Sequence, residues 1–203
     1  MKRCLWCSLW VFWLMGGSYA QMVITEVNST ASAYARYIEV MNAGSESIDV
    51  SDYSITYGND GSDKLIAEPL TADGYAGGCV LSPGEYFLIL RSDGAFRSEY
   101  PTVVLNDGPD DGDNASIEWM GHGYLYLNGG ADYVMLHDQS GGVVDRFGSA
   151  TVSWEDNHAF ERVHYPNTGT DLEAHWRDMG SGVTGSPGRP NDSSLPVQLG
   201  RFS

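Results

Sequence analysis

The chain is poor in cysteine. Its 203 residues include three, and two of these, Cys4 and Cys7, fall in an apolar run near the N-terminus. Cys79 is the only one in the rest of the chain, which excludes an intrachain disulfide there. Two glycines precede Cys79 and Val80-Leu81 follow it. This context predicts a small buried hydrophobe at the start of a strand rather than a reactive thiol.

Positive charge is also scarce. Eleven Lys and Arg stand against 27 Asp and Glu, which gives a formal net charge of −16. Binding to a phosphate backbone requires clustered Lys and Arg, so we expect no nucleic-acid partner. Hydrophobic residues make up 42% of the chain. That share supports a packed core and excludes a disordered chain.

No apolar run is long enough to span a membrane. The run from Leu5 to Met15 is shorter than the about 20 residues that a spanning helix needs. Lys2 and Arg3 precede it, and Ser18-Tyr19-Ala20 places small residues where a signal peptidase reads. We therefore predict a cleaved signal peptide over residues 1–20. The expected location is extracellular or at the cell surface, with the periplasm as the alternative.

Helical periodicity is nearly absent, and short runs bounded by Gly, Pro, Asn and Asp take its place. One window, Gly94 to Tyr100 after Ser92-Asp93, predicts a single helical turn. Because crossover helices are missing, a parallel α/β sheet is excluded. The pattern predicts an all-β sandwich or barrel, antiparallel or mixed. The predicted strands are 22–28, 36–42, 48–50, 53–57, 79–81, 86–90, 103–105, 117–120, 124–127, 133–136, 143–147 and 160–163.

Alternation within three of these runs predicts which side chains face the core. In 22–28 it places Ile24 on the opposite face from Val23 and Val27. In 36–42, Ile38 and Val40 share a face with Glu39 between them. The run 86–90 (YFLIL) is apolar on both faces, which is typical of a central strand.

A series of short motifs follows in order along the chain. They are ITEVN (24–28), YIEVMN (37–42), IDVSDY (48–53), LSPGEY (81–86), NGGADYVML (128–136), Asp138 with GVVD (142–145), FERV (160–163) and SPGRPN (186–191). Together they resemble the lamin tail domain in its bacterial secreted form. The resemblance implies an immunoglobulin-like β-sandwich over residues 21–191, mostly antiparallel and with an acidic loop insertion. It implies no active site.

The C-terminal part changes character. From Gly180 onward the chain is rich in Gly, Ser and Pro, which predicts a domain edge and a linker. The end, LPVQLGRFS (195–203), is apolar again. It resembles the segment that leads into the C-terminal regions of Bacteroidota proteins exported by the type IX route. We expect residues 192–203 to be a linker or the start of a missing segment, so the chain is a fragment or carries a remnant.

Recognisable catalytic motifs are missing. The chain has no G-x-S-x-G elbow, and its five histidines show no zinc spacing. Ser140, between Asp138 and two glycines, predicts a β-turn. His158 and His164 could converge with His175, although a structural or surface role is favoured over a metal site. We predict that the chain is not an enzyme.

One acidic segment is a candidate metal site. Five carboxylates and two amides fall within residues 106–118. Two interpretations stay open, a solvated acidic turn and a Ca²⁺ loop with hard oxygen ligands. The predicted metal ligands are Asp107, Asp110, Asp111, Asp113, Asn114 and Glu118. Calcium is the only cofactor that we predict.

Two functions from different classes follow. The first is a secreted, non-catalytic β-sandwich module, monomeric in isolation, that binds an extracellular protein or polysaccharide or spaces other domains. The second is an accessory domain, or a fragment, of an exported calcium-dependent hydrolase. A deep pocket with converging carboxylates or histidines would favour the second. An intermediate-filament role is excluded because the chain has no heptad rod.

Overall fold

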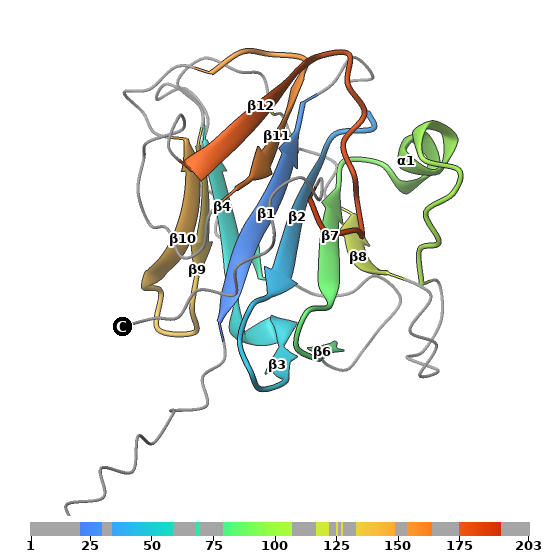
Figure 1. Ribbon diagram of the computed structural model, residues 1–203. Coiled ribbons are helices and arrows are strands. Elements are labelled where there is room, and N and C mark those ends of the chain that lie inside the picture. The colour runs from blue at the N-terminus through green and yellow to red at the C-terminus, as the bar shows by residue number, and fades with distance from the viewer. Residues whose placement is uncertain are drawn as a thin grey trace, which may run out of the picture.

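The computed structural model describes residues 21–29, 34–58, 68–69, 79–106, 117–121, 125, 127, 133–148, 154–163 and 175–191. These residues form two β-sheets that enclose one core, as in an immunoglobulin-like sandwich (Figure 1). The predicted signal peptide and the tail 192–203 lie outside the described residues. Within the described part of the chain, no helix is long and apolar enough to cross a membrane.

The larger sheet contains, within the described residues, β1 (Met22–Asn28), β2 (Tyr37–Asn42), β7 (Tyr86–Leu90), β8 (Glu118–Gly121), β11 (His158–Arg162) and β12 (Trp176–Ser181). Their order is β12-β11-β1-β2-β7-β8. Neighbouring strands are antiparallel except for β7 and β8, which are parallel. β1 thus lies between β2, the next strand in the sequence, and β11, which comes much later in the sequence.

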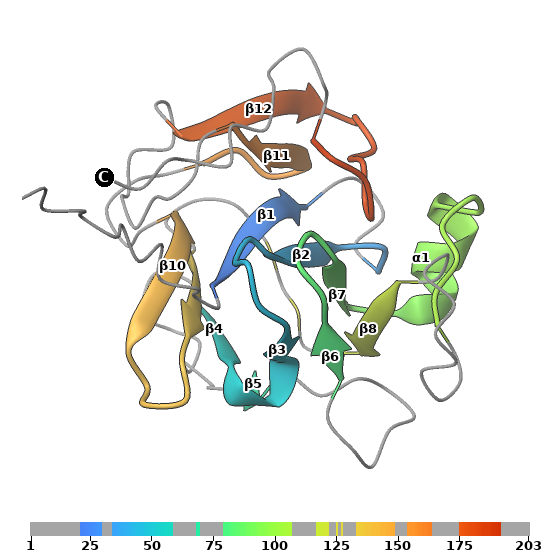
Figure 2. The same cartoon turned by 60° about the horizontal axis from the view of Figure 1, so that its bottom comes forward.

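The smaller sheet contains β4 (Ser54–Gly58), β5 (Glu68–Pro69), β9 (Tyr133–His137) and β10 (Val143–Gly148), in the antiparallel order β10-β9-β4-β5. A separate pair joins β3 (Ile48–Asp49) to β6 (Val80–Leu81). A 3₁₀ turn, Val50–Asp52, follows β3 where we had predicted that the strand continues. Figure 2 shows β10, β4 and β5 to one side of the larger sheet.

The turn at Asp138 and the helical turn after Ser92 form where the sequence predicts them. The Asp138 carboxylate accepts hydrogen bonds from the backbone N–H groups of Ser140 and Gly142, both at 2.9 Å, between β9 and β10. The predicted helical turn is α1 (Asp93–Glu99), and the Ser92 side chain accepts from the Ala95 N–H at its start. Cys79 is buried directly before β6, as its apolar context indicated.

Two hydrophobic clusters hold the layers together. The first fills the space between the sheets and includes an aromatic group made of Phe147, Trp154, Phe160 and Trp176. The second lies on the opposite face of the larger sheet, which we call the outer face. There the Tyr37 ring packs edge-on against Phe96 of α1 and Tyr100, both at 5.5 Å between ring centroids. α1 therefore covers part of the outer face, near its β8 edge (Figure 2).

The predicted facing of Ile24 was wrong. Ile24 and Val27 both belong to the core between the sheets. The pairing register of β1 with β2 shifts between Ile24 and Glu26, so Thr25 is the extra residue of a β-bulge. A bulge resets the alternation of side chains along a strand, and strict period-2 counting fails across it.

Some predicted strands differ in the structure. Residues 103–105 form no strand; Leu105 makes a single parallel bridge to Ile117. Leu125 and Leu127, from the predicted strand 124–127, are buried outside the named strands. β5 and β12 were not predicted, because neither has apolar alternation. β7, predicted to be central, lies between β2 and β8 and is buried from Phe87 to Leu90.

The Gly/Ser/Pro-rich segment after β12 is not a free linker over its first part. Residues 182–191, which we call the strap, turn back from β12 and run over the outer face toward β7 (Figure 1). Asn191 closes the strap, since its side-chain amide donates to the carbonyl oxygens of Thr25 (2.9 Å) and Arg162 (3.1 Å). The strap is therefore an integral part of the sandwich.

Candidate functional site

Most of the predicted calcium ligands cannot be placed. Asp107, Asp110, Asp111, Asp113 and Asn114 lie outside the described residues. Glu118 begins β8, and its Oε1 accepts from the Asn106 side-chain amide at 2.6 Å. This contact brings together the two ends of the acidic segment. Calcium binding stays a prediction.

Of the three histidines considered together from the sequence, His158 forms a contact with a carboxylate. His158 Nδ1 lies 2.7 Å from the Asp178 carboxylate, across the β11–β12 pair. His164 lies outside the described residues. Among the residues that the structure describes, no group of three or more His, Cys, Asp or Glu side chains is placed to hold a metal ion.

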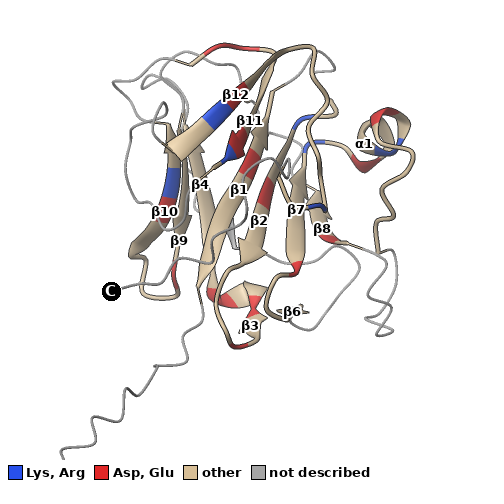
Figure 3. Ribbon diagram, in the orientation of Figure 1, with Lys and Arg blue, Asp and Glu red and all other residues tan. Residues whose placement is uncertain are grey.

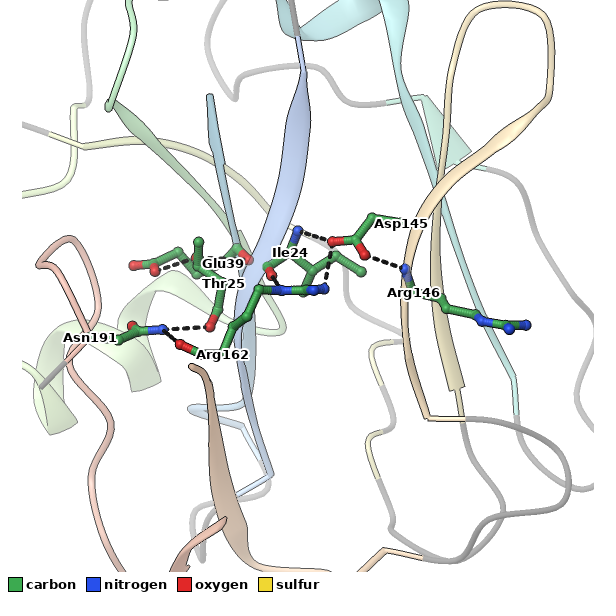
Figure 4. Close-up of polar contacts among 7 residues, drawn as sticks. All are labelled: Ile24, Thr25, Glu39, Asp145, Arg146, Arg162 and Asn191. Carbon is green, nitrogen blue, oxygen red and sulfur yellow. Dashed lines mark hydrogen bonds and ion pairs between the residues drawn. The ribbon is translucent and has the colours of Figure 1, made fainter. Parts of the chain in front are cut away.

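A buried ion pair joins the two sheets. Arg162 of β11 donates from Nη2 to Asp145 Oδ2 of β10 at 2.6 Å, and from Nε to the Ile24 carbonyl at 2.6 Å. Asp145 also accepts from the N–H groups of Ile24 and Arg146, both at 2.8 Å (Figure 4). The Arg162 guanidinium stacks over the Trp176 ring, 4.6 Å from its centroid.

The surroundings of Asp145 set its charge. Burial raises the pKa of its carboxyl, while the Arg162 guanidinium and the backbone donors oppose that rise. Both side chains are nearly inaccessible to water, at 0% exposure for Arg162 and 2% for Asp145. A pair of this kind is strongly destabilising to break, because the partner that remains is a buried charge.

Three glutamates form a row across the outer face. Glu161 of β11, Glu26 of β1 and Glu39 of β2 are direct cross-strand neighbours, and each is at most 1% exposed. Figure 3 shows these acidic positions side by side on the three strands. We call Glu161, Glu26 and Glu39 the glutamate row.

The row continues into other residues at both ends. Arg177 of β12 is the cross-strand neighbour of Glu161, and Leu88 of β7 is that of Glu39. Arg177 Nη2 donates to Glu161 Oε2 at 2.7 Å. Within the described part of the chain, Arg177 is the one cation paired with the row.

Neutral donors serve the other two glutamates. Glu26 Oε1 accepts from the Tyr37 hydroxyl at 2.5 Å, and its carboxyl also accepts from the Ser186 N–H of the strap. Glu39 contacts the Thr25 hydroxyl through Oε1 at 2.5 Å and accepts the Gly188 N–H through Oε2 at 2.6 Å. The strap thus supplies two backbone donors to two buried carboxyls.

Burial dominates the titration of these groups. It raises the pKa of the Glu26 carboxyl to about 8, with the Glu161 charge adding to the rise and the Tyr37 hydrogen bond opposing it. Burial, reinforced by the Glu26 charge, raises the pKa of Glu39 well above its ordinary range. Burial also raises the pKa of Tyr37. The phenol therefore stays protonated and remains a hydrogen-bond donor.

The glutamate row was not predicted from the sequence. A glutamate between Ile38 and Val40 is the usual pattern of a half-buried strand with one polar face, and so Glu39 was expected to face away from the core. It does so, but the strap covers it. A usable signal was the match between the ITEV and YIEV motifs, each with one glutamate inside an apolar strand.

The buried ionisable side chains of the described residues hold the layers in place. The Asp145–Arg162 pair binds sheet to sheet, and the glutamate row binds the strap to the larger sheet.

Comparison with known proteins agrees with this architecture. No curated protein matches the chain. The family model of the lamin tail domain matches residues 17–151, more than half of the chain, and this range contains β1 to β10. β11, β12 and the strap follow the matched range. The lamin tail domain is an immunoglobulin-like, non-catalytic family, and this chain belongs to it.

Proposed function

We propose that the protein is a secreted, non-catalytic β-sandwich module that binds an extracellular protein or polysaccharide, or spaces other domains at the cell surface. One observation carries the proposal. Among the described residues, the four acidic residues buried most deeply, Asp145, Glu26, Glu39 and Glu161, are at most 1% exposed as whole residues and bond to the protein's own backbone and side chains. A catalytic acid or base must reach a substrate proton directly or through one water molecule.

The extracellular setting rests on the N-terminal residues. The charged start, apolar run and small residues of 1–20 match a secretory signal. The formal net charge of −16 disfavours self-association, which agrees with a monomer. The same charge opposes binding to nucleic acid. Calcium bound by the 106–118 segment would stabilise such a module outside the cell, where the ion is abundant.

Secretion is tested by expressing the full chain in a bacterial host and fractionating the culture. We expect the protein in the exported fraction, with Gln21 as the first residue by mass spectrometry. Replacing Lys2 and Arg3 by Glu should retain the chain inside the cell. An unprocessed N-terminus starting at Met1 would contradict the extracellular assignment.

The non-catalytic assignment is tested with ester, phosphoester and glycoside panels, beside binding to a polysaccharide array and to duplex DNA. We expect no turnover and no retention of DNA at about 0.15 M salt. Reproducible turnover that one carboxylate or histidine substitution abolishes would overturn the proposal. It would favour the alternative of a hydrolase or its accessory domain.

A further inference from the structure

The strap is hydrogen-bonded to the three carboxyl groups of the glutamate row in the sheet beneath it. Its backbone donors Ser186 N–H and Gly188 N–H meet Glu26 and Glu39, and the Ser186 hydroxyl donates to Glu161 Oε1 at 2.9 Å. The three carboxyls of the row are therefore bridged by two residues of the strap. Ionisation of the row acts on the strap in two opposite ways, because it strengthens these hydrogen bonds and also places charge on carboxyls that the strap keeps from water. The burial of the charge is the larger of the two effects.

The hydrogen bonds around Glu39 can all form when its carboxyl carries a proton. The Thr25 hydroxyl has one hydrogen, yet it faces two acceptors, the Glu39 carbonyl at 3.3 Å and Glu39 Oε1 at 2.5 Å. If Thr25 donates to the carbonyl, a hydrogen on Glu39 Oε1 makes the shorter contact. Glu39 Oε2 then still accepts from Gly188 N–H. A neutral Glu39 satisfies every donor around it.

Full ionisation of the row would place three negative charges next to one another. Directly opposed residues on neighbouring antiparallel strands have Cβ atoms about 5 Å apart, and like charges there are destabilising. Arg177 faces the row from β12 and pairs with Glu161. Within the described ranges, the other titratable groups that act on Glu26 and Glu39 are the phenols of Tyr37, Tyr86 and, through Tyr37, Tyr100. A phenol that ionises adds negative charge, so none of the three can compensate.

The strap packs closely against Glu26. A Cβ built on Gly185 would overlap both Glu26 Oε1 and the Tyr37 hydroxyl. Glu26 therefore cannot move toward the strap without displacing it. Gly180 near the end of β12 and Gly182 at the start of the strap have positive φ angles of 91° and 72°. Glycine adopts such angles freely, so these two residues are suited to act as a hinge.

We propose that residues 182–191 are a pH-sensitive strap, which stays closed over the outer face while Glu26 and Glu39 hold at least one proton between them and opens when that proton is lost. The raised pKa of Glu26, about 8, agrees with this geometry and sets opening in mildly alkaline solution. Opening hydrates Glu26 and Glu39, which relieves both their burial and their repulsion. The Asp145–Arg162 pair keeps the two sheets together meanwhile.

The test is hydrogen exchange of the whole protein at pH 6 and pH 9, with each protection factor corrected for the intrinsic effect of pH. In the wild-type protein we expect protection of peptides from 183–190 to fall about tenfold or more, while β1 and β2 keep theirs. Glu39→Gln should retain strap protection at pH 9, because the Gln amide donates to Thr25 as a protonated Glu39 would. Glu155→Gln, at an exposed position, is the matched control and should behave as wild type.

Three results would overturn the proposal. One is equal strap protection at both pH values, and another is the same loss in Glu39→Gln as in wild type. The third is loss of protection in β1 and β2 together with the strap, which is global unfolding. If Glu39→Gln does not fold, Glu26→Gln replaces it. The carboxyl ¹³C shifts of wild-type Glu26 and Glu39 also decide the matter, since both groups fully ionised at pH 6 would contradict it.

Discussion

Arg162 in β11 of the larger sheet donates to Asp145 in β10 of the smaller sheet, through the interior of the sandwich. The same pair binds both backbone polar groups of Ile24, with Asp145 accepting from its N–H and Arg162 donating to its carbonyl. Backbone pairing of β1 with β11 begins only at Glu26, beyond the bulge. The ion pair therefore binds β1 just beyond the end of its ladder with β11.

Asp145→Asn should lower the free energy of unfolding by about 3–5 kcal/mol, since it leaves a buried guanidinium without a counter-charge. Urea denaturation at pH 7 measures the change. Asp52→Asn, the same substitution at an exposed position, should change stability by less than about 0.5 kcal/mol. A loss below about 1 kcal/mol for Asp145→Asn would show that the pair does not hold the sheets together.

Stability should fall as the pH rises from 5 to 9. The Glu26 pKa is about 8 in the folded protein against an ordinary 4.5, so between these values the folded state binds the proton and the unfolded state does not. The stabilisation is complete below 4.5 and is lost as the pH passes 8, by roughly 2–4 kcal/mol. Denaturant titrations from pH 5 to 9 measure the slope.

Glu26→Gln provides the control for this slope. It should flatten the pH dependence and leave the protein more stable than wild type at pH 9, because the Gln amide stays neutral. Glu155→Gln should keep the wild-type slope. A Glu26→Gln curve parallel to wild type would mean that other groups cause the pH dependence.

Gly185→Ala should lower the free energy of unfolding by about 2 kcal/mol, as expected for an overpacked site. The new Cβ would meet Glu26 and Tyr37 under the strap. Gly94→Ala in α1 is the matched control, because no atom lies within 4 Å of its Cβ. There the substitution should stabilise by about 0.5 kcal/mol, since it favours the helix. Equal effects at both glycines would contradict the close fit of the strap.

Calcium should raise the melting temperature of the protein by about 2–4 °C relative to EDTA, if the 106–118 segment binds it. Magnesium should do less, because it requires stricter octahedral geometry. Asp111→Ala and Asp113→Ala should each reduce the shift. An unchanged melting temperature with no calorimetric heat would leave a solvated acidic turn.

The strand pattern could be predicted because its signals are local. Short runs bounded by turn residues predicted β2, β7, β9 and β10, with β7 apolar on both faces. The turn at Asp138 and the cap at Ser92 depend on neighbours only a few residues away. β12 (WRDMGS) lacks alternation and is a strand because it pairs with β11. The bulge at Thr25 is equally invisible, since no glycine marks it.

The candidate site could not be predicted because it depends on long-range pairing. Glu26 and Glu161 are neighbours only once β1 pairs with β11. The composition from Gly180 onward predicted a domain edge and a linker, because glycines needed for close fit give the same composition as glycines needed for flexibility, whereas the family resemblance placed 186–191 inside the domain. Gly185 belongs to the first kind, since the carboxyl below it leaves no room for a side chain.

The central place of β1 also determines how the molecule folds. Ile24 forms a hydrogen bond with Asp145, 121 residues further along the chain, and Thr25 forms one with Asn191, 166 residues further along. Contacts of such sequence separation require large loops to close before they contribute any stabilisation, which slows folding. During synthesis, one edge of β1 stays open until β11 has emerged from the ribosome. An open strand edge pairs readily with other chains, so an unfinished or truncated chain is the form of this protein most prone to aggregate.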